Sequence, residues 1–121
     1  MQVQSGQAGS LLIVEDDDGA RDALGDIFGL EGYRVAYSRN GKEALCQLRN
    51  SPLPDVIILD LQMPVMDGWQ FRHEQMKDQS IAKVPVIVVT AFQRAADIDA
   101  VAIMQKPIDV ERLLDMVRIY C

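Results

Sequence analysis

The chain has 121 residues, which suits one domain, and 49% of them are apolar, which is enough for a buried core. Its formal net charge of −6 argues against nucleic-acid binding by this domain, because phosphate backbones are held by clustered lysines and arginines. No apolar run approaches the length of a membrane span, no secretory signal is visible and the two cysteines lack metal-ligand spacing, so we expect a cytoplasmic protein that does not contact membranes.

Residues 1–10 are polar and rich in glycine and serine, which predicts a flexible N-terminal tail ahead of a single domain over residues 11–121. Five short apolar runs follow in that domain. They are residues 11–14 (LLIV), 34–37 (RVAY), 56–59 (VIIL), 86–89 (VIVV) and 101–104 (VAIM). Continuous apolar runs of this length are typical of strands that are buried on both faces of a parallel sheet.

Segments with helical periodicity separate these runs. The first begins at the acidic residues 16–18, the second carries Leu45 and Leu48 with Cys46 expected near the core, and the third begins near Asp67 with a weak apolar pattern. The last begins near residue 109. Alternating strands and helices predict an α/β fold, a doubly wound parallel sheet of five strands with helices on both faces.

Polar residues follow four of the predicted strands. Glu15 and Asp16 follow the first strand, Asp60 the third, Thr90 the fourth and Lys106 the fifth. Parallel strands bring these ends to one edge of the sheet, where ligands bind in such folds. Carboxylates suit Mg²⁺, a carboxylate can attack a phosphoryl group, and a hydroxyl and an ammonium can stabilise phosphoryl oxygens. The constellation predicts formation of an aspartyl phosphate.

Four segments carry a resemblance to a known family. They are LLIVEDD at 11–17, DVIILDLQMPVMDG at 55–68, VPVIVVTA at 84–91 and QKP at 105–107. Together they resemble the receiver domain of two-component response regulators, the CheY-like fold, over residues 11 to about 119. The resemblance implies the strand order 2-1-3-4-5 and a signalling domain that is not a metabolic enzyme. It also implies a sensor histidine kinase or a phosphotransfer protein as the phosphoryl donor.

The resemblance implies a role for each matching residue. Glu15 and Asp16 match the acidic pair that holds Mg²⁺, for which Mn²⁺ could substitute. Asp60 matches the phosphoacceptor, which is also a metal ligand. Gln62 matches the position whose backbone carbonyl completes the metal shell.

Two further residues match the family's phosphate-binding positions. Thr90 matches the hydroxyl that meets the phosphoryl group, and Lys106 matches the lysine that pairs with the phosphate. The bond from Lys106 to Pro107 is commonly cis in the family, and cis is accessible to X-Pro bonds.

Two departures from the family pattern concern the output surface. Only 16 positions separate Thr90 from Lys106, so residues 94–100 leave room for about two helical turns, and we expect a shortened or irregular fourth helix. Ile103 stands where receivers often carry an aromatic residue that turns inward on activation. We expect phosphorylation chemistry to persist while the output surface differs.

Other interpretations of the same residues are open at this stage. The acidic group at 15–18 could serve only to begin a helix. A receiver that acts as a constitutive interaction module is an alternative. An aspartyl-nucleophile phosphatase of the haloacid-dehalogenase type is disfavoured, because Gln62 stands where its general acid would be. A nucleotide-binding domain is excluded, because no glycine-rich loop follows the first strand.

Overall fold

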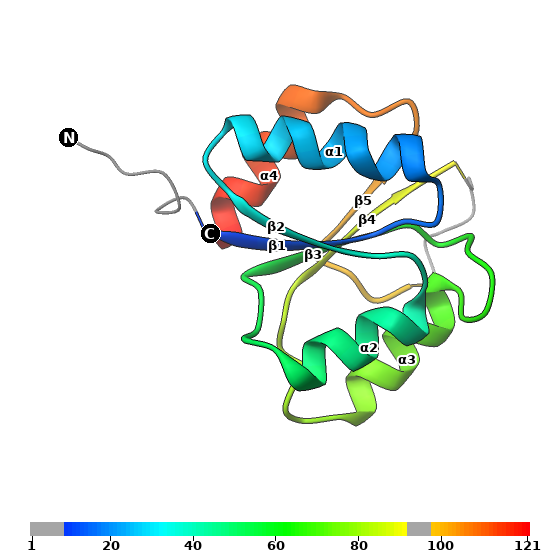
Figure 1. Ribbon diagram of the computed structural model, residues 1–121. Coiled ribbons are helices and arrows are strands. Elements are labelled where there is room, and N and C mark those ends of the chain that lie inside the picture. The colour runs from blue at the N-terminus through cyan, green and yellow to red at the C-terminus, as the bar shows by residue number, and fades with distance from the viewer. Residues whose placement is uncertain (1–8, 92–97) are drawn as a thin grey trace.

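A computed structural model describes residues 9–91 and 98–121. Five parallel strands form one sheet in the order β2-β1-β3-β4-β5 (Figure 1). Their bounds are β1 Ser10–Val14, β2 Arg34–Ser38, β3 Val56–Leu59, β4 Val86–Thr90 and β5 Ala102–Gln105. The predicted α/β fold and strand order are confirmed. Strand β1 takes in Ser10 from the predicted tail, of which residues 1–8 lie outside the described residues.

The three central strands are buried along almost their whole length, as their apolar runs predict. The two edge strands differ from that expectation. Arg34 and Tyr37 of β2 and Ile103 of β5 are exposed, because each edge strand has a neighbour on one side only. The prediction of burial on both faces is therefore confirmed for β1, β3 and β4 and was wrong for the edge strands β2 and β5.

Four helices occur in the described residues, and each begins after an acidic or amide N-cap. They are α1 Asp18–Leu30, α2 Gly41–Asn50, α3 Gly68–Lys77 and α4 Val110–Tyr120. The cap residues Asp17, Asn40, Asp67 and Asp109 each accept a hydrogen bond from a backbone N–H in the first turn. None of these helices is long and apolar enough to cross a bilayer.

The helices cover the two faces of the sheet in pairs. Figure 1 shows α1 and α4 on one face and α2 and α3 on the other. Phe28 of α1 and Leu113 of α4 pack in one core cluster, while Leu48 of α2 and Phe71 of α3 pack in the second. Cys46 of α2 was expected near the core but is exposed, because the inward face of α2 consists of Ala44, Leu45 and Leu48.

The connection between β4 and β5 is where a shortened fourth helix was expected. Most of that prediction falls on residues 92–97, which lie outside the described residues. The described part, residues 98–101, is not helical. Its Ile98 packs in the core cluster beneath α2 and α3, and the Arg72 guanidinium of α3 donates a hydrogen bond of 2.7 Å to the Asp99 carbonyl oxygen.

Candidate functional site

Three carboxylates meet at the carboxyl edge of the sheet. Glu15 and Asp16 follow β1 and Asp60 follows β3, and one oxygen from each lies within 4.8 Å of the others. The pairing of β1 with β3 brings them together, and the Asp60 N–H donates to the Val14 carbonyl at 3.0 Å. Glu15 and Asp60 are buried, whereas Asp16 is exposed. The predicted acidic cluster therefore forms, with one member open to solvent.

Lys106 provides the positive charge that the predicted site requires. Its ammonium Nζ donates a hydrogen bond of 2.9 Å to Oε1 of Glu15, whose side chain is 4% exposed. The other carboxylate oxygen of Glu15 accepts from the backbone N–H of Asp17 at 3.2 Å. The ammonium thus lies beside the carboxylates, 91 residues away along the chain.

Thr90 is the last residue of β4 and is fully buried. Its backbone carbonyl accepts the N–H of Lys106 at 2.9 Å, so the ends of β4 and β5 are joined at the site. The Lys106–Pro107 peptide bond is cis, as expected. Both residues predicted to bind phosphoryl oxygens therefore stand at the same edge as the acidic cluster.

The β3–α3 loop carries Asp60 and Gln62 toward the site. The N–H of Gly68, the first residue of α3, donates to the Leu61 carbonyl at 2.9 Å and closes this loop. Gln62 contacts Asp60 through its backbone N–H. The metal-ligand role expected for its carbonyl stays a prediction. Val65 adopts a φ of 70° in the same loop, a conformation that β-branched residues rarely adopt.

The electrostatics of the cluster disfavour full ionisation. Burial raises the pKa of Asp60 to about 7, and the Glu15 carboxylate adds to the rise, while Lys106 and the Gln62 N–H oppose it. Partial burial and the Glu15 carboxyl raise the pKa of Asp16. Burial lowers the pKa of Lys106, but its hydrogen bond to Glu15 and the charge of Asp60 outweigh burial, so the pKa is raised.

The charges and the donor atoms of the cluster indicate whether its residues fit a metal ion. Three carboxylates face one ammonium, and two of the carboxyl groups have raised pKa values. All three donors are hard oxygen ligands, which suit Mg²⁺ or Ca²⁺ better than softer metals. A divalent cation would relieve the repulsion, so the residues fit such an ion.

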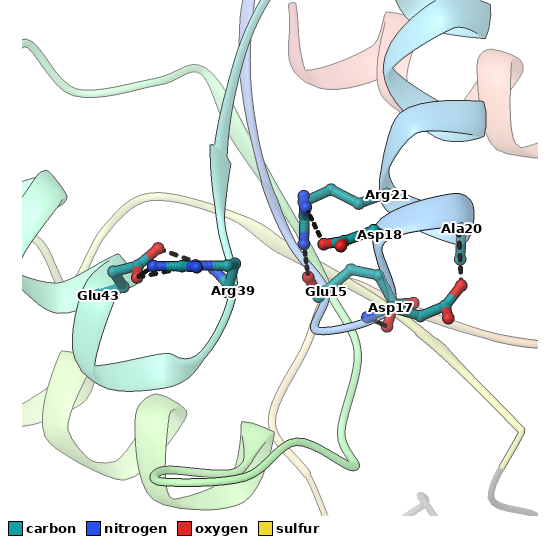
Figure 2. A network of polar contacts seen from close by, with 7 residues as sticks. All are labelled: Glu15, Asp17, Asp18, Ala20, Arg21, Arg39 and Glu43. Atoms are coloured by element: carbon teal, nitrogen blue, oxygen red, sulfur yellow. Dashed lines mark hydrogen bonds and ion pairs between the residues drawn. The ribbon is translucent and has the colours of Figure 1, made fainter.

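Sequence reasoning missed one residue next to the cluster. Arg21 of α1 lies between Asp18 and the end of β1, and its guanidinium donates to the backbone carbonyl of Glu15 at 3.0 Å (Figure 2). Asp17 caps α1 by accepting from the Ala20 N–H at 2.7 Å. Helix capping thus explains Asp17 and leaves Glu15 and Asp16 for another purpose. No side-chain pattern in the sequence signals the Arg21 contact, because its acceptor is a backbone atom.

The sequence of the chain is similar to sequences of known proteins. Residues 11–118 match the response regulator receiver domain. The chain is 32% identical over 117 residues to the polar-differentiation response regulator DivK of Brucella anthropi, an alignment that covers 92% of this chain and 94% of that protein.

Two solved structures are similar over almost the whole chain. The signal receiver domain of a signal transduction histidine kinase from Syntrophus aciditrophicus has a TM-score of 0.84 and 30% identity, covering 93% of this chain and 89% of that one. The response regulator TrrA from Thermotoga maritima, in complex with Mg²⁺-BeF, has a TM-score of 0.83 and 26% identity, covering 93% and 98%. The chain belongs to the response-regulator receiver domain family of two-component signalling.

Proposed function

We propose that Asp60 accepts a phosphoryl group from a histidine kinase or a phosphotransfer protein, and that this modification switches contacts with a downstream protein. The observation that carries the proposal is the meeting of three carboxylates within 4.8 Å, with Lys106 bonded to one of them and Thr90 at the adjacent strand end. Asp60 is the acidic residue that follows the central strand β3, so it stands between the acidic pair and the Thr90–Lys106 pair.

Glu15, Asp16, Asp60 and the backbone carbonyl of Gln62 are the residues that would hold Mg²⁺ in this proposal, with Mn²⁺ as a substitute. The bound ion would supply positive charge to the phosphoryl oxygens and to the carboxylates. Support comes from the raised pKa values of Asp16 and Asp60, to which burial contributes most and the Glu15 carboxyl adds. The Mg²⁺-BeF complex of TrrA is consistent with the same ion.

The chain's own residues account for the transfer step. An oxygen of ionised Asp60 forms a bond to phosphorus while the bond from phosphorus to the donor's leaving atom breaks, and the electron pair stays on that atom. With acetyl phosphate the leaving group is acetate, which needs no proton. The Lys106 ammonium and the Thr90 hydroxyl would stabilise charge on the phosphoryl oxygens, which is the main requirement of this chemistry.

A phosphatase that turns over substrate is less well supported. Phosphatases of the haloacid-dehalogenase type carry a general acid two residues after the nucleophile, and Gln62 cannot serve as one at that position. The described site contains no histidine. A long-lived phosphoaspartate suits a signal, since the modified state must persist until a partner binds it.

Acetyl phosphate with MgCl₂, followed by intact mass spectrometry, tests the proposal. We expect the wild-type chain to gain one phosphoryl group and Asp60→Asn to gain none. Asp26→Asn is the matched control, because Asp26 is an exposed carboxylate on α1 away from the cluster, and this variant should be modified like wild type. A gain that survives Asp60→Asn, or no gain by wild type, would contradict the proposal and favour a constitutive interaction module.

A further inference from the structure

Arg21 is a mostly buried cation that the phosphoryl chemistry described above does not use. Its side chain is 13% exposed, although it lies on a surface helix. One guanidinium nitrogen, Nη1, donates to the backbone carbonyl of Glu15 at 3.0 Å, and the other, Nη2, pairs with Asp18 (Figure 2). The side chain therefore reaches back six residues from α1 to the end of β1.

The two bonds enclose the turn that carries the exposed metal-ligand candidate. Glu15 stands before this turn and Asp18 is the first residue of α1, so Asp16 lies between the two anchors. The backbone N–H of Asp17 is also bonded, to the Glu15 carboxylate. These bonds fix the backbone on both sides of Asp16.

A guanidinium is suited to this position for a geometric reason. Its planar fork presents separate N–H groups to two acceptors at once, whereas the ammonium of lysine is a single point on a flexible stem. A charged donor on a carbonyl is also a stronger bond than a neutral one. Arg21 therefore orients the backbone at Glu15 in a way that neither lysine nor glutamine would reproduce.

We propose that Arg21 is a positioning residue for the divalent-cation site, which it preorganises by fixing the turn that presents Asp16 beside Glu15 and Asp60. This inference rests on the proposed function, since it concerns the same cation site. Residues that orient metal ligands in this way typically change metal affinity by roughly tenfold or more when they are replaced.

The positioning role and a purely electrostatic role predict opposite changes. Replacing Arg21 by glutamine removes a positive charge that acts on the Glu15 carboxylate of the cluster, and by charge alone this would make Mg²⁺ bind more tightly. If Arg21 acts by holding the turn, the same replacement makes Mg²⁺ bind more weakly. The sign of the change in dissociation constant therefore separates the two roles.

Calorimetric titration of the metal-free protein with MgCl₂ measures this sign. We expect Arg21→Gln to raise the Mg²⁺ dissociation constant roughly tenfold, and Arg21→Lys to raise it several-fold although the charge is kept. At saturating MgCl₂ the rate of phosphorylation by acetyl phosphate should return toward the wild-type rate. That recovery would not occur if the variant had simply lost its fold.

Arg39→Gln is the matched control. Arg39 also pairs with a carboxylate near a helix start, Glu43 of α2, and its side chain is 69% exposed (Figure 2). The variant removes the same charge without touching the β1–α1 turn, so its Mg²⁺ dissociation constant should stay within about twofold of wild type, as expected for a screened surface charge.

Three outcomes are decisive. An unchanged or lower dissociation constant in Arg21→Gln would overturn the positioning role. If Arg21→Gln does not fold, as judged by circular dichroism, then an unchanged constant in Arg21→Lys would overturn it instead. Failure of wild type to bind Mg²⁺ at all would overturn the proposed function, and with it the basis of this inference.

Discussion

Asp60 is difficult to ionise in the metal-free fold, since burial and the Glu15 carboxylate raise its pKa to about 7 from a usual value of 3.8. Between these two values the folded chain keeps a proton that the unfolded chain releases. The raised pKa of Asp60 therefore stabilises the metal-free fold fully below about pH 4, and this stabilisation is lost as the pH rises through about 7. The residue that we propose as the nucleophile thus destabilises the metal-free fold at physiological pH.

Replacing Asp60 by asparagine should remove this loss, because the amide keeps the shape of the side chain and carries no charge. In the presence of a chelator at pH 8 we expect Asp60→Asn to raise the free energy of unfolding by about 2 kcal/mol. The upper limit is larger, because raising the pKa from 3.8 to about 7 costs at most about 1.4 kcal/mol for each pH unit between these values. At pH 5 the gain should be much smaller. Urea denaturation at both pH values measures the difference.

Asp26→Asn again serves as the control for this prediction. Asp26 is exposed on α1, so its replacement should change the free energy of unfolding by less than about 0.5 kcal/mol at either pH. Equal stability of wild type and Asp60→Asn at pH 8 would show that the charge of Asp60 does not destabilise the metal-free fold.

At the scale of helices and strands, the sequence predicted most where apolar runs or stripes are uninterrupted. Strand β3 has the bounds that its run predicted. Helix α3 was harder to predict, because its inward face includes Gln75, a buried amide. Gln75 donates hydrogen bonds to the carbonyls of Ile81 and Val84, so a polar residue stands where an apolar one would have completed the pattern.

The site likewise has features that could be predicted from the sequence and features that could not. The topology alone brought Glu15, Asp60 and Lys106 to one edge, and their residue types were readable from the strand ends. Arg21 and Val65 were not predictable, since one binds a backbone carbonyl and the other adopts a φ of 70° that its side chain disfavours. Features that depend on backbone atoms leave no pattern in the order of side chains.

Helix α3 begins in close contact with the loop that carries Asp60, and a glycine is required there. A Cβ atom on Gly68 would lie 2.8 Å from the backbone carbonyl oxygen of Asp60 and 2.7 Å from a methyl group of Leu61. We expect Gly68→Ala to lower the free energy of unfolding by about 2 kcal/mol, the usual size of overpacking in a tight contact, as measured by urea denaturation.

A glycine elsewhere in the chain provides the comparison. A Cβ atom on Gly29 of α1 would meet no atom within 4 Å, so Gly29→Ala should raise the free energy of unfolding by up to about 1 kcal/mol through helix propensity alone. Two substitutions of the same kind should therefore have opposite signs. A Gly68→Ala variant as stable as wild type would show that the loop can move away from α3 without cost.

At the scale of the whole molecule, the site joins the separate parts of the fold. Its residues lie at the carboxyl ends of β1, β3, β4 and β5, and Lys106 contacts Glu15 across 91 residues of sequence. A cation bound there binds the folded chain and has no comparable site in the unfolded one. Its binding free energy is therefore added to the stability of the entire domain.

Stabilisation by Mg²⁺ should therefore depend on pH in the direction opposite to the stability of the metal-free protein. At pH 8 Asp60 is mostly ionised and free to bind the ion, whereas at pH 6, one unit below its pKa of about 7, the ion must displace a proton. We expect the increase in free energy of unfolding on adding a fixed, high concentration of MgCl₂ to be about 1 kcal/mol larger at pH 8 than at pH 6.

The comparison with and without MgCl₂ cancels the pH dependence of stability that comes from groups outside the cation site. Asp60→Asn, which has no proton to displace at that position, should lose most of the difference between the two pH values. A wild-type stabilisation that is equal at both pH values, or larger at pH 6, would mean that Asp60 does not bind the ion. The cation would then have to be held by Glu15, Asp16 and the Gln62 carbonyl without Asp60.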